Sequence, residues 1–173
     1  MGPLRALSVN NPWGWALCAS LPEGDPFKSG ENRTSGLGEA NIGTVVLIQV
    51  GLKKPDRAVV EDLKSMAAAF EVPMPKWAGE ARKEIGAVVG AVIFKADLAA
   101  SEVTNPYDKI WLTPPPETGP DKRRFWAVRS SVIFPMPIPC KGKVRPLLFT
   151  VPPDVDAAAR QQLALVARGL KSR

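Results

Sequence analysis

The sequence predicts an α+β fold, a β-barrel with peripheral helices, and three observations lead to this prediction. The chain of 173 residues contains 18 prolines and 14 glycines, which favour short elements joined by defined loops over a helical bundle. The stretches 45–50 and 86–94 are rich in the β-branched residues that are typical of buried strands. The stretches 55–70 and 154–170 repeat apolar residues at three- and four-residue steps, as amphipathic helices do.

The N-terminal part is expected to contain a short helix, a long loop and a strand. Pro12 suits the first turn of a helix and Asn11 suits its N-cap, so a helix is predicted to begin there. The polar, glycine-rich stretch 22–41 is a loop of unusual length for a compact domain, and such loops often carry function. The strand 45–50 follows this loop.

The middle of the chain is expected to alternate between helix and strand. The apolar stripe of the helix 55–70 consists of Val59, Leu63, Met66 and Phe70. Pro73 and Pro75 end this helix, and a second short helix is predicted over 75–83. The strand 86–94 comes next, and its glycines permit tight curvature of the backbone.

The C-terminal part is predicted to complete the barrel and to end in a helix. After a proline-rich loop at 99–120, the predicted strands are 125–128, 132–134 and 147–151. The first two are expected to be separate strands on either side of Arg129–Ser131. We assign residues 1–152 to one domain and residues 153–173 to a C-terminal helix that packs on it or extends from it.

The sequence contains no histidine, which excludes several mechanisms. A Ser-His-Asp or Cys-His nucleophile system and a His-ligated zinc site cannot be built without imidazole. Acid–base chemistry near neutral pH must use carboxylates, lysine, tyrosine or cysteine with shifted pKa values. Cys18 and Cys140 are too few for a disulfide framework or a Cys-only zinc site, so both are predicted to be reduced. No cofactor and no metal are predicted.

The apolar stretches predict a cytoplasmic protein without a membrane partner. None approaches the ~20 residues that a membrane-spanning helix needs. Asn10, Asn11 and Pro12 interrupt the only early apolar run, which is therefore not expected to be a signal peptide. The oligomeric state stays open.

The positive charge of the chain is concentrated in one segment. The net charge is +6, and the segment Asp121–Arg145 carries all of it, with seven bases against one acid. The candidate phosphate-binding residues in this segment are Arg123, Arg124, Arg129, Lys141, Lys143 and Arg145. Concentrated positive charge is expected of a phosphate-binding surface, while the alternative of a solvated face kept basic for solubility stays open.

The segment Lys28–Thr34 is the leading candidate for a site. It brings together a cation, a carboxylate, an amide and a guanidinium, at Lys28, Glu31, Asn32 and Arg33. Arg33 can bind a phosphate through two parallel hydrogen bonds, and Lys28 can act as a point charge. Glu31 and Asn32 can read donors and acceptors of a base or a sugar. In an open alternative, Glu31 and Arg33 form a salt bridge that pins the loop to the barrel.

Amides and aromatic rings near the N-terminus are candidates for base binding. Asn11, Pro12 and Trp13 are contiguous, and an exposed indole stacks on a base for ~1–3 kcal/mol. Trp126 follows the basic pair Arg123–Arg124, which interleaves cations and aromatic rings as single-stranded nucleic-acid sites do. A tryptophan more often packs in a core, and we expect at least three of the five to do so.

Four segments in a fixed order resemble a known family. They are Ala6–Leu17 with its Pro-Trp pair, Lys28–Thr34, the Gly-led strand Gly43–Val50, and Pro137–Lys143 with a Pro-x-Pro-x-x-Gly turn. In this order, over residues 4–152, the chain resembles the ASCH domain family of the PUA-like superfamily. The resemblance implies a PUA-like β-barrel, mixed and mainly antiparallel, with about five to six strands, that handles RNA or modified nucleotides. The cleft residues it implies are Ser8, Pro12, Trp13, Lys28, Glu31 and Arg33, with Trp126 on the facing strand.

Two departures from the family pattern bear on the ligand. Asn10–Asn11 stands where family members commonly have Arg-Gln, so the polar contacts to a ligand are expected to differ. Glu31 stands where a branch that resembles an amidohydrolase of N4-acetylated cytidine has a threonine.

Three classes of function stay open at this point. The first is a nucleic-acid- or nucleotide-binding domain, with RNA, single-stranded nucleic acid or a modified nucleotide as its partner. The second is a hydrolase of the ribonuclease or amidohydrolase type, with Lys28 and Glu31 as its catalytic acid–base pair. The third is a protein-interaction module whose basic face meets an acidic protein.

Overall fold

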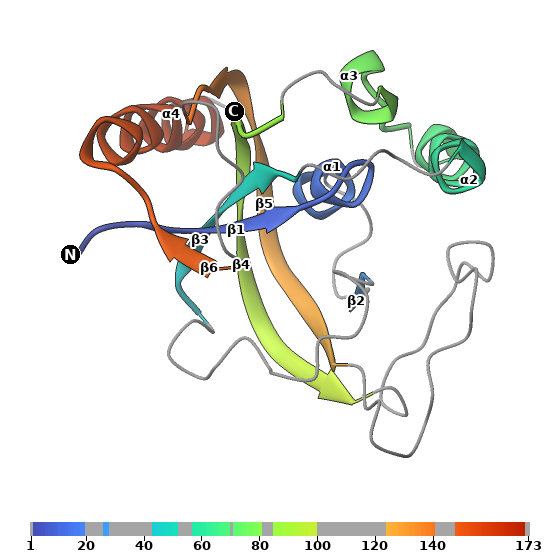
Figure 1. The fold of residues 1–173 in the computed structure, drawn as a ribbon, viewed down its shortest axis with the longest axis horizontal. Helices are drawn as coiled ribbons and strands as arrows, with labels where there is room; N and C mark the ends of the chain where they lie inside the picture. The colour runs from blue at the N-terminus through green and yellow to red at the C-terminus, as the bar shows by residue number, and fades with distance from the viewer. Residues whose placement is uncertain are drawn as a thin grey trace.

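The computed structural model contains one mixed β-sheet with helices on both of its faces (Figure 1). The structure describes residues 2–19, 26–27, 43–51, 57–69, 71–80, 85–99, 124–140 and 148–171. In chain order the elements are β1 (Arg5–Val9), α1 (Trp13–Cys18), β2 (Pro26–Phe27), β3 (Val45–Val50), α2 (Arg57–Ala69), α3 (Lys76–Gly79), β4 (Val88–Ala99), β5 (Arg124–Ile138), β6 (Leu148–Thr150) and α4 (Pro153–Lys171).

The six strands lie in the order β2-β5-β4-β3-β1-β6. Only β1 and β3 run parallel, and the other neighbouring pairs are antiparallel. The α+β class and the mixed, mainly antiparallel pairing are therefore confirmed. The expected closure into a barrel is wrong for the strands that the structure describes. The outer strands, β2 and β6, have two and three residues, so they offer few backbone groups for pairing and end the sheet instead of closing it.

The alternation of side chains along the strands creates a hydrophobic core on each face of the sheet. In β3, Val46, Ile48 and Val50 lie in the core that includes residues of α1, α2 and α3. Leu47, between them, lies in the core under α4. The predicted strand 45–50 is confirmed, and both of its faces are buried because helices cover the sheet on each side (Figure 1).

The strand β5 corrects the expectation of two separate strands around Arg129–Ser131. It is continuous over 15 residues, and Ser130 and Ser131 pair with Ile93 and Val92 of β4. Irregularities in the register on either side of these pairs let the two long strands bend together. Pairing with β4 thus outweighs the weak strand preference of the two serines.

The helix α2 confirms the predicted amphipathic helix and ends in a Schellman motif. The N–H of Val72 donates to the carbonyl of Ala67 at 2.9 Å, and the N–H of Glu71 donates to the carbonyl of Ala68 at 3.1 Å. Glu71 has a φ of 60°, in the left-handed region where this motif usually has glycine. The second predicted helix, 75–83, is shorter than expected, because α3 ends at Gly79.

The helix α4 confirms the predicted C-terminal helix and is tied to the N-terminal segment. Its residues Val155 and Ala159 are buried against the sheet. Asp156 accepts a 2.7 Å hydrogen bond from the N–H of Leu4 and forms an ion pair with Arg160, one turn further on. Arg160 in turn donates to the carbonyl of Gly2 at 2.8 Å.

Candidate functional site

Ser8, one of the cleft residues that the family resemblance implies, takes part in a buried hydrogen-bond chain. Ser8 Oγ donates to Gln49 Oε1 on the neighbouring strand β3. Gln49 is fully buried, and its Nε2 donates to the carbonyl of Gly86 at 3.0 Å. Gly86 has a φ of 81° and forms the turn that leads into β4. The hydroxyl of Ser8 therefore helps to hold β1, β3 and this turn together.

Asn11 is not the N-cap of α1, contrary to expectation. The N-cap position is Pro12, and no side chain caps this helix. The side chain of Asn11 instead donates through Nδ2 to the carbonyl of Trp77, at the start of α3, with a length of 3.4 Å. Asn11 exposes 4% of its surface, and its Oδ1 has no hydrogen-bond partner among the described residues. Oδ1 of Asn11 is thus a buried hydrogen-bond acceptor, located where β1, α1 and α3 meet, for which no described residue supplies a donor.

The structure describes the side chains of two of the five tryptophans, Trp15 and Trp77. Trp15 is fully buried in the core beneath α1, and Trp77 is partly buried against the same core. Trp13 is the first residue of α1, next to the buried Pro12. The side chains of Trp13 and Trp126 lie outside the described part of the chain, as does Trp111, so their expected roles stay predictions.

The two-residue strand β2 links the candidate loop to the basic strand. Pro26 pairs with Ala127, and Phe27 pairs with Trp126, near the start of β5. The pairing therefore brings the chain directly before Lys28 alongside the backbone of Trp126–Ala127, although about a hundred residues separate the two segments. Lys28, Glu31, Asn32 and Arg33 lie outside the described residues, and so does the alternative ion pair between Glu31 and Arg33.

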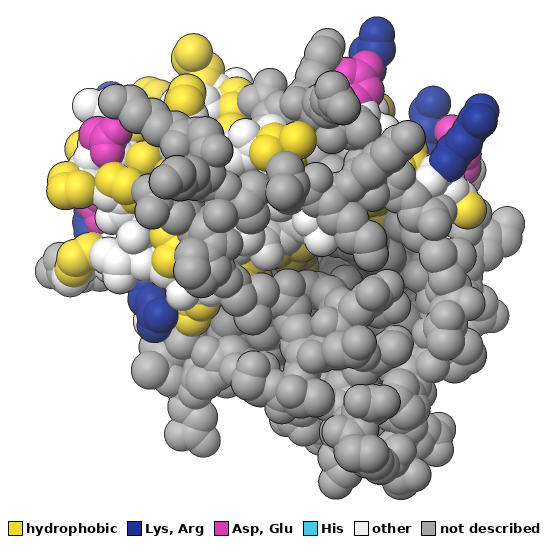
Figure 2. Space-filling model, viewed as in Figure 1, with side chains coloured by type: hydrophobic (Ala, Val, Ile, Leu, Met, Phe, Trp, Pro, Cys, Tyr) yellow, Lys and Arg dark blue, Asp and Glu magenta, His cyan; other side chains and the backbone are white. Residues whose placement is uncertain are grey.

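Most of the candidate phosphate-binding residues also lie outside the described part of the chain. Arg129 is exposed on β5, and Arg124 begins that strand. The residues whose positions the structure does not describe are Arg123, Lys141, Lys143 and Arg145. In the view of Figure 2, the described lysine and arginine side chains are scattered over the surface, while hydrophobic side chains gather over α4.

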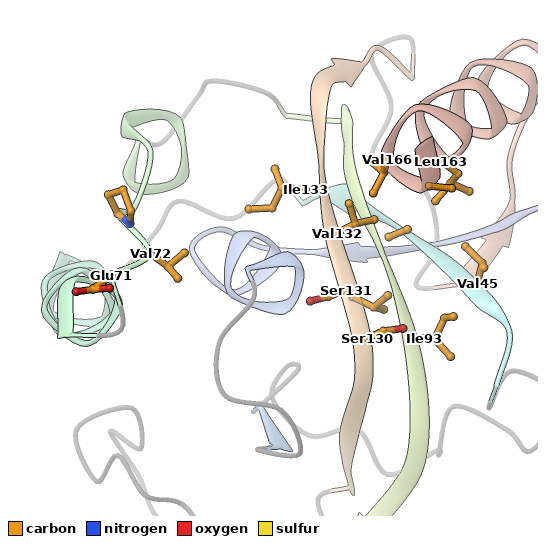
Figure 3. Close-up of a pocket in the computed structure, with 14 residues that line it drawn as sticks. Val45, Glu71, Val72, Ile93, Ser130, Ser131, Val132, Ile133, Leu163 and Val166 are labelled. Carbon is orange, nitrogen blue, oxygen red and sulfur yellow. The ribbon is translucent and has the colours of Figure 1, made fainter. Parts of the chain in front are cut away.

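An apolar groove of about 670 Å³ is a feature that the sequence analysis missed (Figure 3). It extends over β5 from the segment Glu71–Pro73, after α2, to the C-terminal half of α4. Its lining residues are Val45, Glu71, Val72, Pro73, Ala91, Val92, Ile93, Ser130, Ser131, Val132, Ile133, Leu163, Val166 and Ala167. No predicted site residue is among them. Two hydroxyls and one carboxylate among aliphatic side chains suit the binding of an apolar group better than acid–base chemistry.

Cys18 and Cys140 are the two thiols of the chain, and both lie in its described part. Both cysteines are free and buried, so neither takes part in a disulfide in this structure. Burial raises the pKa of the Cys18 thiol, so this cysteine stays protonated and unreactive near neutral pH. Among the described residues, no group of three acidic or cysteine side chains lies close enough to hold a metal ion.

Comparison with known proteins adds no assignment of family. No model of a known protein family matches the chain, and no curated protein is similar enough in sequence to match it. None of the described helices is long and apolar enough to cross a membrane.

Proposed function

We propose that this chain is a nucleotide- or nucleic-acid-binding protein of the PUA-like kind, and that RNA is its ligand. The order of the four segments that resemble the ASCH family supports the proposal. The concentration of the whole net charge between residues 121 and 145 supports it as well, because clustered lysine and arginine attract phosphates.

The observation that carries the proposal is the pairing of Phe27 with Trp126. It joins the strand before Lys28 to the strand that begins with Arg124. Paired strands lie about 5 Å apart, so the backbone of Phe27, which directly precedes Lys28 in the sequence, lies beside a strand whose sequence contains Arg124 and Trp126. A nucleotide needs this combination, since cations bind its phosphate and amides or aromatic rings bind its base.

The test compares two variants that lose the same amount of positive charge. The first carries Arg123→Gln, Arg124→Gln, Lys141→Gln and Lys143→Gln, all in the basic segment. The control variant carries Arg57→Gln, Lys64→Gln, Lys76→Gln and Arg168→Gln, at exposed positions on α2, α3 and α4. The affinity for a labelled single-stranded RNA is measured by fluorescence anisotropy over a range of salt concentrations.

Wild-type affinity is expected to fall as salt rises, with a log–log slope of about −0.7 for each phosphate that is neutralised. The first variant should bind at least roughly tenfold more weakly and lose about two to three units of slope. The control variant should keep most of both. Equal losses in the two variants, or binding that ignores salt, would contradict the proposal. Cleavage of the RNA in the same samples would instead support the hydrolase with Lys28 and Glu31.

A further inference from the structure

We propose that the edge of β5 at residues 130–133 binds an extended peptide of another protein, which joins the sheet as an additional strand. The peptide inserts a short run of apolar side chains into the groove and carries an acidic residue beside that run. This inference goes beyond the proposed function, because it concerns the apolar groove, whose lining contains none of the predicted site residues.

The groove follows the edge of β5 and is not confined to one face of the sheet. Successive side chains of a strand point to opposite faces, yet the groove is lined by four consecutive residues, Ser130–Ile133. Ile133 packs against the core that includes residues of α1, α2 and α3, and Val132 packs against the core under α4. Figure 3 shows these two side chains on opposite sides of β5. A space that reaches both of them must open at the edge of the strand.

Backbone groups of β5 point into this space. The carbonyl oxygen of Val132 faces β4, because a Cβ atom on Gly90 of that strand would collide with it. Neighbouring residues of a strand direct their backbone groups to opposite sides, so Ser131 and Ile133 direct their N–H and C=O groups away from β4. Among the described strands, β2 alone covers this edge of β5, and it pairs only with 126–127. An extended peptide supplies the donors and acceptors that these outward groups need.

The two ends of this stretch carry the features that protect strand edges, and the stretch between them does not. Arg129 is exposed and lies where the register between β5 and β4 shifts. Pro135, also exposed, has no N–H group. Charged residues, irregularities and prolines are the usual means of keeping foreign strands from an edge. Residues 130–133 have neither charge nor proline, so this part of the edge is open to a short strand.

The same edge already accepts an extended segment of this chain. Pro26 and Phe27 pair antiparallel with Ala127 and Trp126, further along β5. A bound peptide would extend this row of pairs in the direction of the groove. A small apolar molecule could contact the walls of the groove, but it would leave the outward backbone groups without partners. The edge therefore favours a peptide as the occupant.

The walls of the groove determine the side chains that the peptide carries. Leu163 and Val166 line it on the α4 side, and Val72 lines it on the side of α2. Alternate side chains of an added strand point to these two walls, and both walls are apolar, so the peptide needs consecutive apolar residues.

The charges around the groove favour an acidic residue next to the apolar run. Arg129 and Arg168 are exposed, and each directly adjoins a lining residue in the sequence. Glu71 is the single charged residue of the lining. Two guanidinium groups against one carboxylate complement a peptide of net negative charge.

The test selects binders to the whole chain from a phage-displayed library of random short peptides. We expect the selected peptides to contain an apolar run with an acidic residue beside it. The best peptide is then synthesised in two forms, each N-methylated at every second residue of the run, in opposite phase. Only one phase removes the N–H groups that face β5, so one form should bind at least roughly tenfold more weakly and the other should bind like the parent. Affinities are measured by fluorescence anisotropy.

A pair of variants tests whether the peptide occupies the groove. Ala167→Trp adds a large side chain at an exposed lining position of α4, and it should weaken binding roughly tenfold. Ala164→Trp is the matched control, because Ala164 is exposed on the same helix but does not line the groove. It should leave the affinity unchanged.

Each part of the test can overturn the inference. Failure of the selection to yield a peptide that binds the whole chain overturns it, and so do equal effects of the two methylation patterns. Equal affinities of the two tryptophan variants also overturn it. The variant with four glutamine substitutions in the basic segment should bind the peptide like the wild type. If it loses the peptide together with RNA, the peptide binds at the nucleotide surface, and the inference fails while the proposed function stands.

Discussion

Ser8 and Gln49 are register partners on the parallel strands β1 and β3, and a 2.5 Å hydrogen bond runs from Ser8 Oγ to Gln49 Oε1. The family resemblance implies that Ser8 lines a cleft, which stays a prediction. The structure gives its hydroxyl a partner within the sheet, and Gln49 also donates to the carbonyl of Gly86. Gln49 thus satisfies both ends of its carboxamide inside the protein, whereas Asn11 has a partner for one end among the described residues.

Replacing Gln49 by leucine should destabilise the protein strongly. Leucine fills a similar volume, but it leaves the hydroxyl of Ser8 and the carbonyl of Gly86 without this buried partner. We expect the free energy of unfolding to fall by about 2–4 kcal/mol, measured by urea denaturation. Gln161→Leu, at an exposed position on α4, is the control and should change stability by less than about 0.5 kcal/mol. Similar losses in the two variants would contradict the structural role of Gln49.

Glu71→Gly should stabilise the protein. Glu71 has a φ of 60°, a left-handed conformation that costs a residue with a Cβ atom about 1 kcal/mol more than glycine. We expect a rise in Tm of about 2–4 °C by differential scanning calorimetry. Glu61→Gly, inside the same helix, should lower stability by about 1 kcal/mol. A fall in Tm for Glu71→Gly would show that its side chain contributes more than its backbone conformation costs.

The contribution of Asp156 to stability should disappear in acid. The hydrogen bond from Arg160, and next the one from the N–H of Leu4, lower the pKa of Asp156 from its usual value. A carboxyl group with a lowered pKa in the folded state stabilises the protein fully above its unfolded pKa of about 3.9. This stabilisation is lost as the pH falls through the folded pKa.

Asp156→Asn should therefore be less stable than the wild type near neutral pH, and the difference should shrink as the solution is acidified. Urea denaturation in a series from about pH 7 down to about pH 2 measures the effect. Asp154→Asn removes the same charge from an exposed position in the same turn, and it serves as the control. A difference between wild type and Asp156→Asn that stays constant over this range would contradict the ion pair with Arg160.

Cys18 should resist alkylation until the protein unfolds. It is buried, and burial raises the pKa of its thiol, while the thiolate is the form that reacts. In a Cys140→Ser variant, iodoacetamide should modify Cys18 far more slowly in native buffer than in concentrated urea, as followed by mass spectrometry. Equal rates in the two conditions would contradict its burial between α1 and the sheet.

The pattern of apolar residues in the sequence predicted the two long helices, because a helix is formed by residues that are close together in the sequence. The apolar stripe with the buried Leu63 in α2, and that with Val155 and Ala159 in α4, predicted both long helices. That β5 is one continuous strand, and not two, could not be predicted from such a pattern. Ser130 and Ser131 are extended because they pair with β4, and no local pattern records that partner.

In the candidate site too, residue types could be predicted from the sequence, but contacts between distant segments could not. Asn11 was proposed for base binding from its sequence context, but its expected role as N-cap was wrong, because its side chain bonds to Trp77, 66 residues away. The pairing of Phe27 with Trp126 and the groove lined by Leu163 and Ile133 also depend on contacts between distant segments. Residue types indicated which side chains suit a ligand, and the pairing of distant strands determines which of them meet.

The position of β1 between β3 and β6 has a consequence for how the protein is made. β1 leaves the ribosome before the other described strands of this sheet, but the outer edge of β1 is covered only when Leu148–Thr150 of β6 follow. Until then, its unpaired backbone groups are open to other chains, as at any exposed strand edge. The hydrogen bonds of Asp156 to Leu4 and of Arg160 to Gly2 can form only after that, when α4 has been synthesised. Completion of this sheet must therefore wait until β6 has been synthesised, and a chain that stops short of β6 is expected to aggregate.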